Sequence, residues 1–243
     1  MVATEGDPWA VITDDPEGSS ATVQGRGPVA VGAVFAVPHR QRVSVAVALV
    51  GDLPSRLPAP EQVAAGWRRV TADALTIDVP DPDLSEAWRR ILPDLIVQAG
   101  ADDRVAAAEA APFLELAGLR READRARAGL LGVVTLDSWP LRPASPAAVA
   151  ATRVIDRVFV PTRDGLDVLP DVPESWRGGP VDVRNLVTPH GRLSFSVRWH
   201  GDRPALLWER TSGPDEVVIR CPGLDPGWSA TERSGEMLLA AGV

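Results

Sequence analysis

The sequence predicts an α+β protein in which two β-rich regions flank a helical middle. β-Branched residues occupy alternate positions between Arg42 and Val50, which is the period of a half-buried strand. The middle of the chain carries apolar residues at helical spacing, and its last third carries short strand-like runs separated by turns. We therefore expect an N-terminal β region over 1–58, a helical-hairpin region over 59–160 and a C-terminal β domain over 161–243.

Strands are expected throughout the N-terminal region. The runs Val29–Val37 and Arg42–Val50 are rich in Val and Ala, and the four residues between them connect them as a β-hairpin. Ahead of the hairpin, Trp9–Ile12 predicts a short strand among turn residues. We expect these hairpin or sandwich strands to form a sheet with one apolar face.

Four or five helices in antiparallel hairpins are expected in the middle region. Pro60 and the acidic Glu61 open the first helix, Gly100 closes the second, and Ser145 is predicted to cap the last. The predicted helices span Pro60–Val70, Asp81–Gln98, Asp102–Ala110, Pro112–Leu131 and Ala147–Phe159, with an extended piece at Leu75–Pro80.

Strand-like runs with turns between them predict a small antiparallel β-sandwich or meander at the C-terminal end. Turn residues such as Gly201–Pro204 and Ser212–Asp215 separate the runs at a spacing of about 10 residues. The runs are Val181–Val183, Leu193–His200, Ala205–Glu209 and Val217–Arg220.

The composition excludes several classes of function. The 243 residues carry a net charge of −8 and all 25 basic residues are Arg, with no basic run that would indicate a nucleic-acid binder. Without Lys or Tyr, the chain has no Schiff-base or phosphate-loop lysine and no phenolic acid or base. No apolar run approaches the ~20 residues that span a bilayer, and the acidic N-terminus lacks a secretory pattern. We therefore expect a cytoplasmic protein that contacts no membrane.

Neither a metal site nor a cofactor is expected. The histidines are His39, His190 and His200, and none has the spacing to a second ligand that a metal-binding motif requires. A single cysteine excludes an internal disulfide framework, and the place of Cys221 at a strand end with no neighbouring His predicts a buried, inert thiol. The Gly-x-Ser-x-Gly pattern of serine hydrolases does not occur.

The last third of the chain carries its most distinctive pattern. The segment Gly191–Gly201, followed by Arg203–Glu209, resembles the C-terminal β domain of actinobacterial six-hairpin glycosidase-like proteins. The other similar segments are Cys221–Ser229 and Gly235–Leu239 at the end of that domain, Trp67–Leu95 at the entry into the family's helical toroid, and Phe113–Leu119 in one of its hairpins. The resemblance touches most of the chain in order and is strongest in the C-terminal β domain.

The resemblance implies an (α/α)₆ toroid whose loops carry the catalytic carboxylates. Such a toroid has twelve helices, whereas the roughly 100 residues between Ala59 and Pro161 accommodate four or five. We therefore expect a shortened relative that lacks the active-site half of the ring.

Glycoside hydrolysis requires two carboxylates about 5–10 Å apart. We interpret the acidic residues of the helices as solvated charges, and we expect two of them, Glu115 and Glu122, on one helix face. The acids considered are Glu109, Glu115, Glu122 and Asp124. Asp137 and Trp139 follow a helix in a predicted loop, where an acid beside an indole suits a sugar, although a structural loop anchor is the favoured interpretation.

A second candidate sugar surface surrounds the turn after His200. Trp199 and Trp208 would stack on a sugar there. Their polar partners would be His200, Arg203 and Glu209. The favoured interpretation is structural: the two rings fill the core, while the His and Arg side chains bind carbonyl groups at strand ends.

These observations favour a degenerate, non-catalytic glycosidase-like protein that binds a glycan or a protein partner. One alternative is an active carbohydrate hydrolase completed by a second copy of the chain, with Glu115, Glu122, Asp137 or Glu209 recruited to its site. The other is an oligomeric scaffold without a sugar ligand, whose interface is the half-toroid surface rich in Ala and Leu. Because a shortened ring should expose an apolar flank, we expect a dimer.

Overall fold

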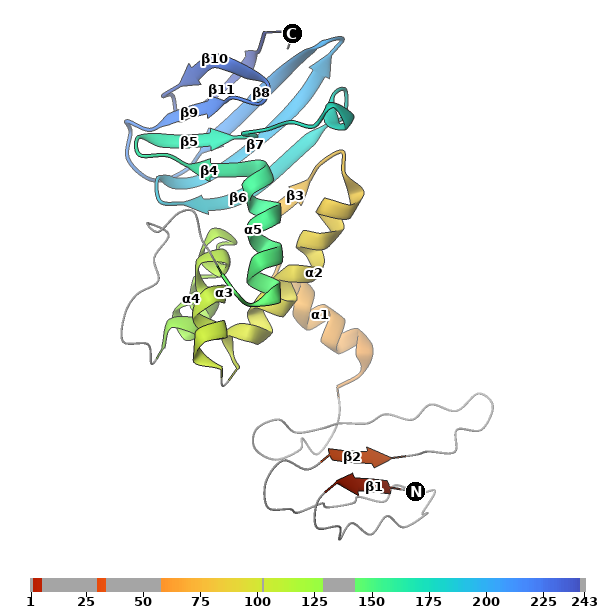
Figure 1. Cartoon of the computed structure of the whole chain (residues 1–243). Helices are drawn as coiled ribbons and strands as arrows, with labels where there is room; N and C mark the ends of the chain where they lie inside the picture. The colour runs from red at the N-terminus through yellow and green to blue at the C-terminus, as the bar shows by residue number, and fades with distance from the viewer. Residues whose placement is uncertain (1, 6–29, 34–57, 102, 129–142, 241–243) are drawn as a thin grey trace. The chain divides into compact units, whose positions relative to one another are not determined.

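Strands, then helices, then strands follow one another along the chain, as predicted for the α+β class, and the structure confirms that class (Figure 1). The computed structural model describes residues 2–5, 30–33, 58–101, 103–128 and 143–240. The chain forms two compact units, residues 1–59 and residues 60–243, and each is described by itself.

The first unit contains a two-stranded ladder. β1, Val2–Glu5, pairs antiparallel with β2, Ala30–Ala33. β2 lies within the predicted strand Val29–Val37. The predicted hairpin partner Arg42–Val50 and the predicted strand Trp9–Ile12 lie outside the described residues.

Five helices lie in the described part of the second unit. They are α1 Pro60–Val70, α2 Pro82–Ala99, α3 Arg104–Leu116, α4 Arg120–Arg127 and α5 Pro146–Val158. α1 has the predicted bounds, and Asp81 caps α2 because its Oδ1 accepts the N–H of Leu84 at 3.0 Å. Ser145 holds the N-cap position of α5, but its hydroxyl accepts a hydrogen bond from Gln98 and does not cap the helix.

The predicted single helix Pro112–Leu131 is wrong. α3 runs through Pro112 and ends before Gly118, which has a φ of +78°. The N–H of Leu119 then donates to the carbonyl oxygen of Leu114 at 2.8 Å. This is the Schellman motif, in which a residue with left-handed backbone ends the helix, so the chain starts a new helix at α4.

A five-stranded antiparallel sheet forms the larger β layer, in the order β11-β8-β7-β6-β3. Its strands are β3 Thr76–Asp78, β6 Val181–Thr188, β7 Gly191–His200, β8 Arg203–Arg210 and β11 Ser234–Leu238. β6, β7 and β8 form a meander and confirm three of the predicted C-terminal runs. β3 belongs to the helical region and pairs with β6, which joins the helices to this edge of the sheet.

Four shorter strands form a second sheet, in the order β10-β9-β5-β4. They are β4 Phe159–Pro161, β5 Gly165–Val168, β9 Val218–Cys221 and β10 Asp225–Ala230. β5 and β9 run parallel, so the prediction of an antiparallel C-terminal domain is wrong for this sheet. The chain leaves β5, forms the meander of the other sheet and returns to β9, which is the long crossover that parallel neighbours require.

One hydrophobic core contains side chains of both sheets and of helices α2 to α5. Buried side chains alternate along β6 and β7, so one face of the five-stranded sheet is buried and the other is partly exposed. Trp88 of α2 lies in this core, and its indole N–H donates to the carbonyl oxygen of Leu75 at 2.8 Å. Trp176, at the end of the 3-10 helix η1 (Glu174–Trp176), is buried as well.

Candidate functional site

Trp208, a predicted sugar contact, lies inside the protein. It is 6% exposed, its indole N–H donates to the carbonyl oxygen of Glu232 at 3.0 Å, and its ring meets that of Trp228 edge-on with centroids 5.2 Å apart. Gly235 of β11 lies against the same ring, because a Cβ there would come within 2.6 Å of it. A ring covered in this way packs in the core, in agreement with the structural interpretation, and Trp208 also reaches the lining of a hollow over the five-stranded sheet.

The neighbouring predicted contacts lie at the β7–β8 turn. Trp199 is half-buried against the core, and its Nε1 has no partner among the described residues. His200 is exposed. The guanidinium group of Arg203 donates hydrogen bonds to the carbonyl oxygens of Leu238 and Leu239, both at 3.1 Å. These hydrogen bonds connect the end of β11 to the β7–β8 turn. Arg203 therefore binds strand-end carbonyls, as its structural interpretation expected.

Glu209 occupies the partly exposed face of the five-stranded sheet. It lies opposite Ser194 of β7 and Ser234 of β11, because each pairs with it across the ladder. These side chains line a shallow hollow of about 700 Å³ over this face. The hollow is also lined by Asp182, Ser196 and Glu236.

Asp182 binds two arginines at the border of this first hollow. Its carboxylate lies 2.7 Å from a guanidinium nitrogen of Arg198 and 3.6 Å from one of Arg184. Asp182 and Arg184 also line a second hollow of about 580 Å³, whose other lining residues come from α1, α2, β3 and the turn between α1 and β3. The two hollows therefore adjoin at this ion pair.

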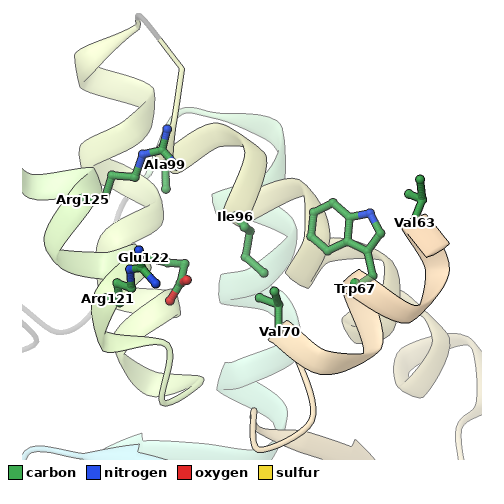
Figure 2. Close-up of a pocket in the computed structure, with 9 residues that line it drawn as sticks. Val63, Trp67, Val70, Ile96, Ala99, Arg121, Glu122 and Arg125 are labelled. Carbon is green, nitrogen blue, oxygen red and sulfur yellow. The ribbon is translucent and has the colours of Figure 1, made fainter. Parts of the chain in front are cut away.

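Trp67 of α1 lines the second hollow and also a third one of about 690 Å³. The third hollow lies between α1, α2 and α4, with Val70 of α1 and Ile96 of α2 as apolar lining (Figure 2). α1 has no buried residue, and its Val63 is 44% exposed, so the apolar stripe of this helix lines the hollow and packs into no core formed by the described residues.

The three hollows follow one another along the second unit. The first and second share Asp182 and Arg184, and the second and third share Trp67. Hydroxyl and charged side chains line the first hollow, whereas an indole and aliphatic side chains line much of the third. Such a surface offers hydrogen bonds and apolar contact to the same ligand.

Two of the predicted helix acids hold the helices together. The carboxylate of Glu109 in α3 accepts hydrogen bonds from the backbone N–H groups of Ala144 and Ser145, at 3.0 and 2.7 Å. It therefore provides acceptors for backbone N–H groups just before α5. Partial burial raises the pKa of Glu109, but these hydrogen bonds outweigh burial and hold the pKa below its usual value. Glu115 is paired with Arg127 of α4.

Glu115 and Glu122 do not share a helix face, because the Schellman turn places them on α3 and α4. Asp124 lies 3.7 Å from a guanidinium nitrogen of Arg127. Glu122 lines the third hollow and is the predicted helix acid that the structure brings near Trp67. The remaining predicted contacts, Asp137 and Trp139, lie outside the described residues.

Burial raises the pKa of Asp156 in α5 and of Asp167 in β5, and neither residue lines the three hollows. A glycoside hydrolase needs an acid with a raised pKa beside a second carboxylate in its sugar cleft. Asp156 and Asp167 therefore do not supply such an acid to the hollows. The predicted burial of Cys221 is confirmed.

Trp67 is the residue lining two hollows that sequence reasoning missed. Val63, Trp67 and Val70 recur at helical spacing on the predicted first helix, which is the usual signal of a face packed into a core. The sequence does not show that this helix buries no residue, because burial depends on which other elements reach it.

Among the described residues, no three His, Cys, Asp or Glu side chains are grouped closely enough to hold a metal ion. No described helix is long and apolar enough to cross a membrane. Comparisons with known proteins found no match among family models, curated proteins or solved structures.

Proposed function

We propose that this chain is a non-catalytic glycan-binding protein, a shortened relative of the six-hairpin glycosidases, which holds an oligosaccharide along the three hollows. Trp67 carries the proposal. Its indole belongs to a helix without a buried residue and lines two hollows at once. We infer that an indole in this position serves a ligand, because the described residues give the helix no core packing.

The lining of the hollows fits the chemistry of sugars. A pyranose ring has apolar C–H groups on its faces and hydroxyl groups around its edge. Trp67 offers an apolar surface for the face, while Glu209, Asp182 and Arg184 offer acceptors and donors for the hydroxyls. Each hollow has a volume within the range of about 300–1,000 Å³ that is typical of small-ligand sites.

The absence of hydrolysis is part of the proposal. Two observations support it: Asp156 and Asp167, whose pKa burial raises, line none of the hollows, and the helical region has five described helices where the resemblance implies twelve. A sugar bound here would meet hydrogen-bonding groups, whereas Asp156 and Asp167 lie elsewhere in the fold.

A thermal-shift screen of the full chain against mono- and oligosaccharides, with chromogenic glycoside hydrolysis measured in the same samples, tests both parts. We expect at least one oligosaccharide to raise the melting temperature by about 2–4 °C at 100 times its Kd, without turnover. Turnover would favour the hydrolase that a second copy completes. No shift across a broad panel would contradict glycan binding.

The scaffold alternative has one specific observation in its favour, which is the exposed apolar stripe of α1. Val63 and Val70 are 44% and 42% exposed and could pack against a second copy of the chain. Light scattering decides between the two functions. A stable dimer that Val63→Asp dissociates, together with no response to any saccharide, would support the scaffold.

A further inference from the structure

Two arginines of α4 line the third hollow. Arg121 and Arg125 are four residues apart on α4, across the hollow from Trp67 (Figure 2). Within the described residues neither guanidinium group has an ion-pair or hydrogen-bond partner, whereas Arg127 on the same helix is paired with Glu115. Two such groups on a pocket wall are available to an anionic ligand.

The C-terminal end of α2 lies close to one of these arginines. A Cβ at Gly100, the residue that closes α2, would lie 3.2 Å from Nη2 of Arg125. The guanidinium group therefore lies over the C-terminal end of α2, where the partial negative charge of the helix attracts a cation. Glycine at this position leaves the space that the guanidinium group uses.

The third hollow matches an acidic sugar in three respects. A guanidinium group binds a carboxylate through paired N–H donors. Trp67 and Ile96 offer an apolar surface to a ring face, and the carboxylate of Glu122 can accept hydrogen bonds from hydroxyl groups. Arg121 and Arg125 carry two positive charges and Glu122 one negative charge, so the lining of this hollow has a net positive charge, although the whole chain has a charge of −8.

We propose that the hollow between α1, α2 and α4 binds a uronic acid unit, with the sugar carboxylate on Arg121 and Arg125 and the ring against Trp67. This inference rests on the proposed function, because it assigns the chemical class of the glycan. The ligand is then an acidic oligosaccharide whose uronate unit occupies the helical end of the three hollows.

Calorimetric titration of the full chain with glucuronate and galacturonate tests the inference, with glucose, galactose and acetate as comparison ligands. We expect saturable binding of at least one uronate, tighter than that of the matching neutral sugar and of acetate, and weaker at higher salt. Arg121→Gln combined with Arg125→Gln should weaken uronate binding about tenfold or more. Arg120→Gln is the matched control, because Arg120 is exposed on the same helix and does not line the hollow.

The possible outcomes separate this inference from the proposed function. The inference is wrong if the uronates bind no more tightly than the matching neutral sugars. It is also wrong if they bind equally well to the wild type and to the variant with both arginines replaced. If neutral oligosaccharides still bind and binding depends on Trp67, the proposed function stands without the acidic unit. If neither neutral nor acidic sugars bind, both fall. Melting temperatures of the variants close to that of the wild type show that the substitutions leave the fold intact.

Discussion

Cys221 shows at the scale of one residue how burial controls chemistry. Its side chain is buried in β9, and burial raises the pKa of the thiol to about 12. Because the thiolate is the reactive form, we expect the native protein to react very slowly with Ellman's reagent at about pH 8. The same protein unfolded in guanidinium chloride should react within minutes. Rapid reaction of the native protein would contradict this placement of the cysteine.

Glu109 should make stability depend on pH. Its pKa in the folded protein lies below the ordinary value of 4.5, so its hydrogen bonds contribute stability above about pH 4.5 that is lost as the pH falls through the folded pKa. Glu109→Gln should lower the free energy of unfolding by about 1 kcal/mol at neutral pH. The difference from the wild type should shrink in acid.

Urea unfolding at several pH values checks this expectation. Glu122→Gln is the matched control, because Glu122 has no ion-pair or hydrogen-bond partner among the described residues. The free energy of unfolding of Glu109→Gln is expected to approach that of the wild type as the pH falls. If the difference in free energy instead stays constant from neutral to acidic pH, the charge of Glu109 is not the cause of the difference.

Single residues could be predicted where their role is local. The strand-end role of Arg203 and the burial of Cys221 follow from their places next to a turn and in an apolar run. Trp67 and Arg210 could not be predicted in this way. Arg210 is 2% exposed and donates to the carbonyl oxygens of Ser212 and Asp215, although arginine is usually found at the surface.

At the scale of elements, Gly118 separates α3 from α4. Its φ of +78° is a conformation that strains residues with a Cβ, while the space around it is sufficient for ordinary contact. We expect Gly118→Ala to destabilise the protein by about 1–2 kcal/mol. Gly118→Asn should cost less, because asparagine tolerates left-handed backbone. Equal unfolding free energies for the alanine variant and the wild type in urea would refute the role of the turn.

The ends of helices could be predicted where residues at those ends determine them. Pro60 begins α1, Asp81 caps α2 and Gly100 closes it. The break between α3 and α4 was missed because the apolar stripe continues through it, so periodicity alone does not show where the helix axis changes. The parallel pairing of β5 and β9 was missed because strand pairing depends on residues far apart in the chain.

At the scale of the second unit, the helical region and the two sheets pack around one core. The helices α2 to α5 bury apolar residues in the core that also contains the two sheets, and β3 extends the five-stranded sheet from within the helical region. The helix whose apolar stripe stays outside this core is α1. This exception places Trp67 in the lining of both the second and the third hollow, on a helix that sequence alone assigns to packing, and the proposed function makes this helix a ligand surface.

Titration of a screened oligosaccharide into the wild type, Trp67→Ala and Trp67→Phe tests whether these hollows bind glycan. Loss of the ring should weaken binding about tenfold or more, whereas phenylalanine should retain most of the affinity because it keeps an aromatic face. Val105→Ala controls for truncation of an apolar side chain, since Val105 is 69% exposed on α3 and lines none of the three hollows. The proposal predicts that only Trp67→Ala binds the oligosaccharide weakly, and that Trp67→Phe and Val105→Ala have Kd values close to that of the wild type. Equal Kd values for the wild type and Trp67→Ala would contradict it.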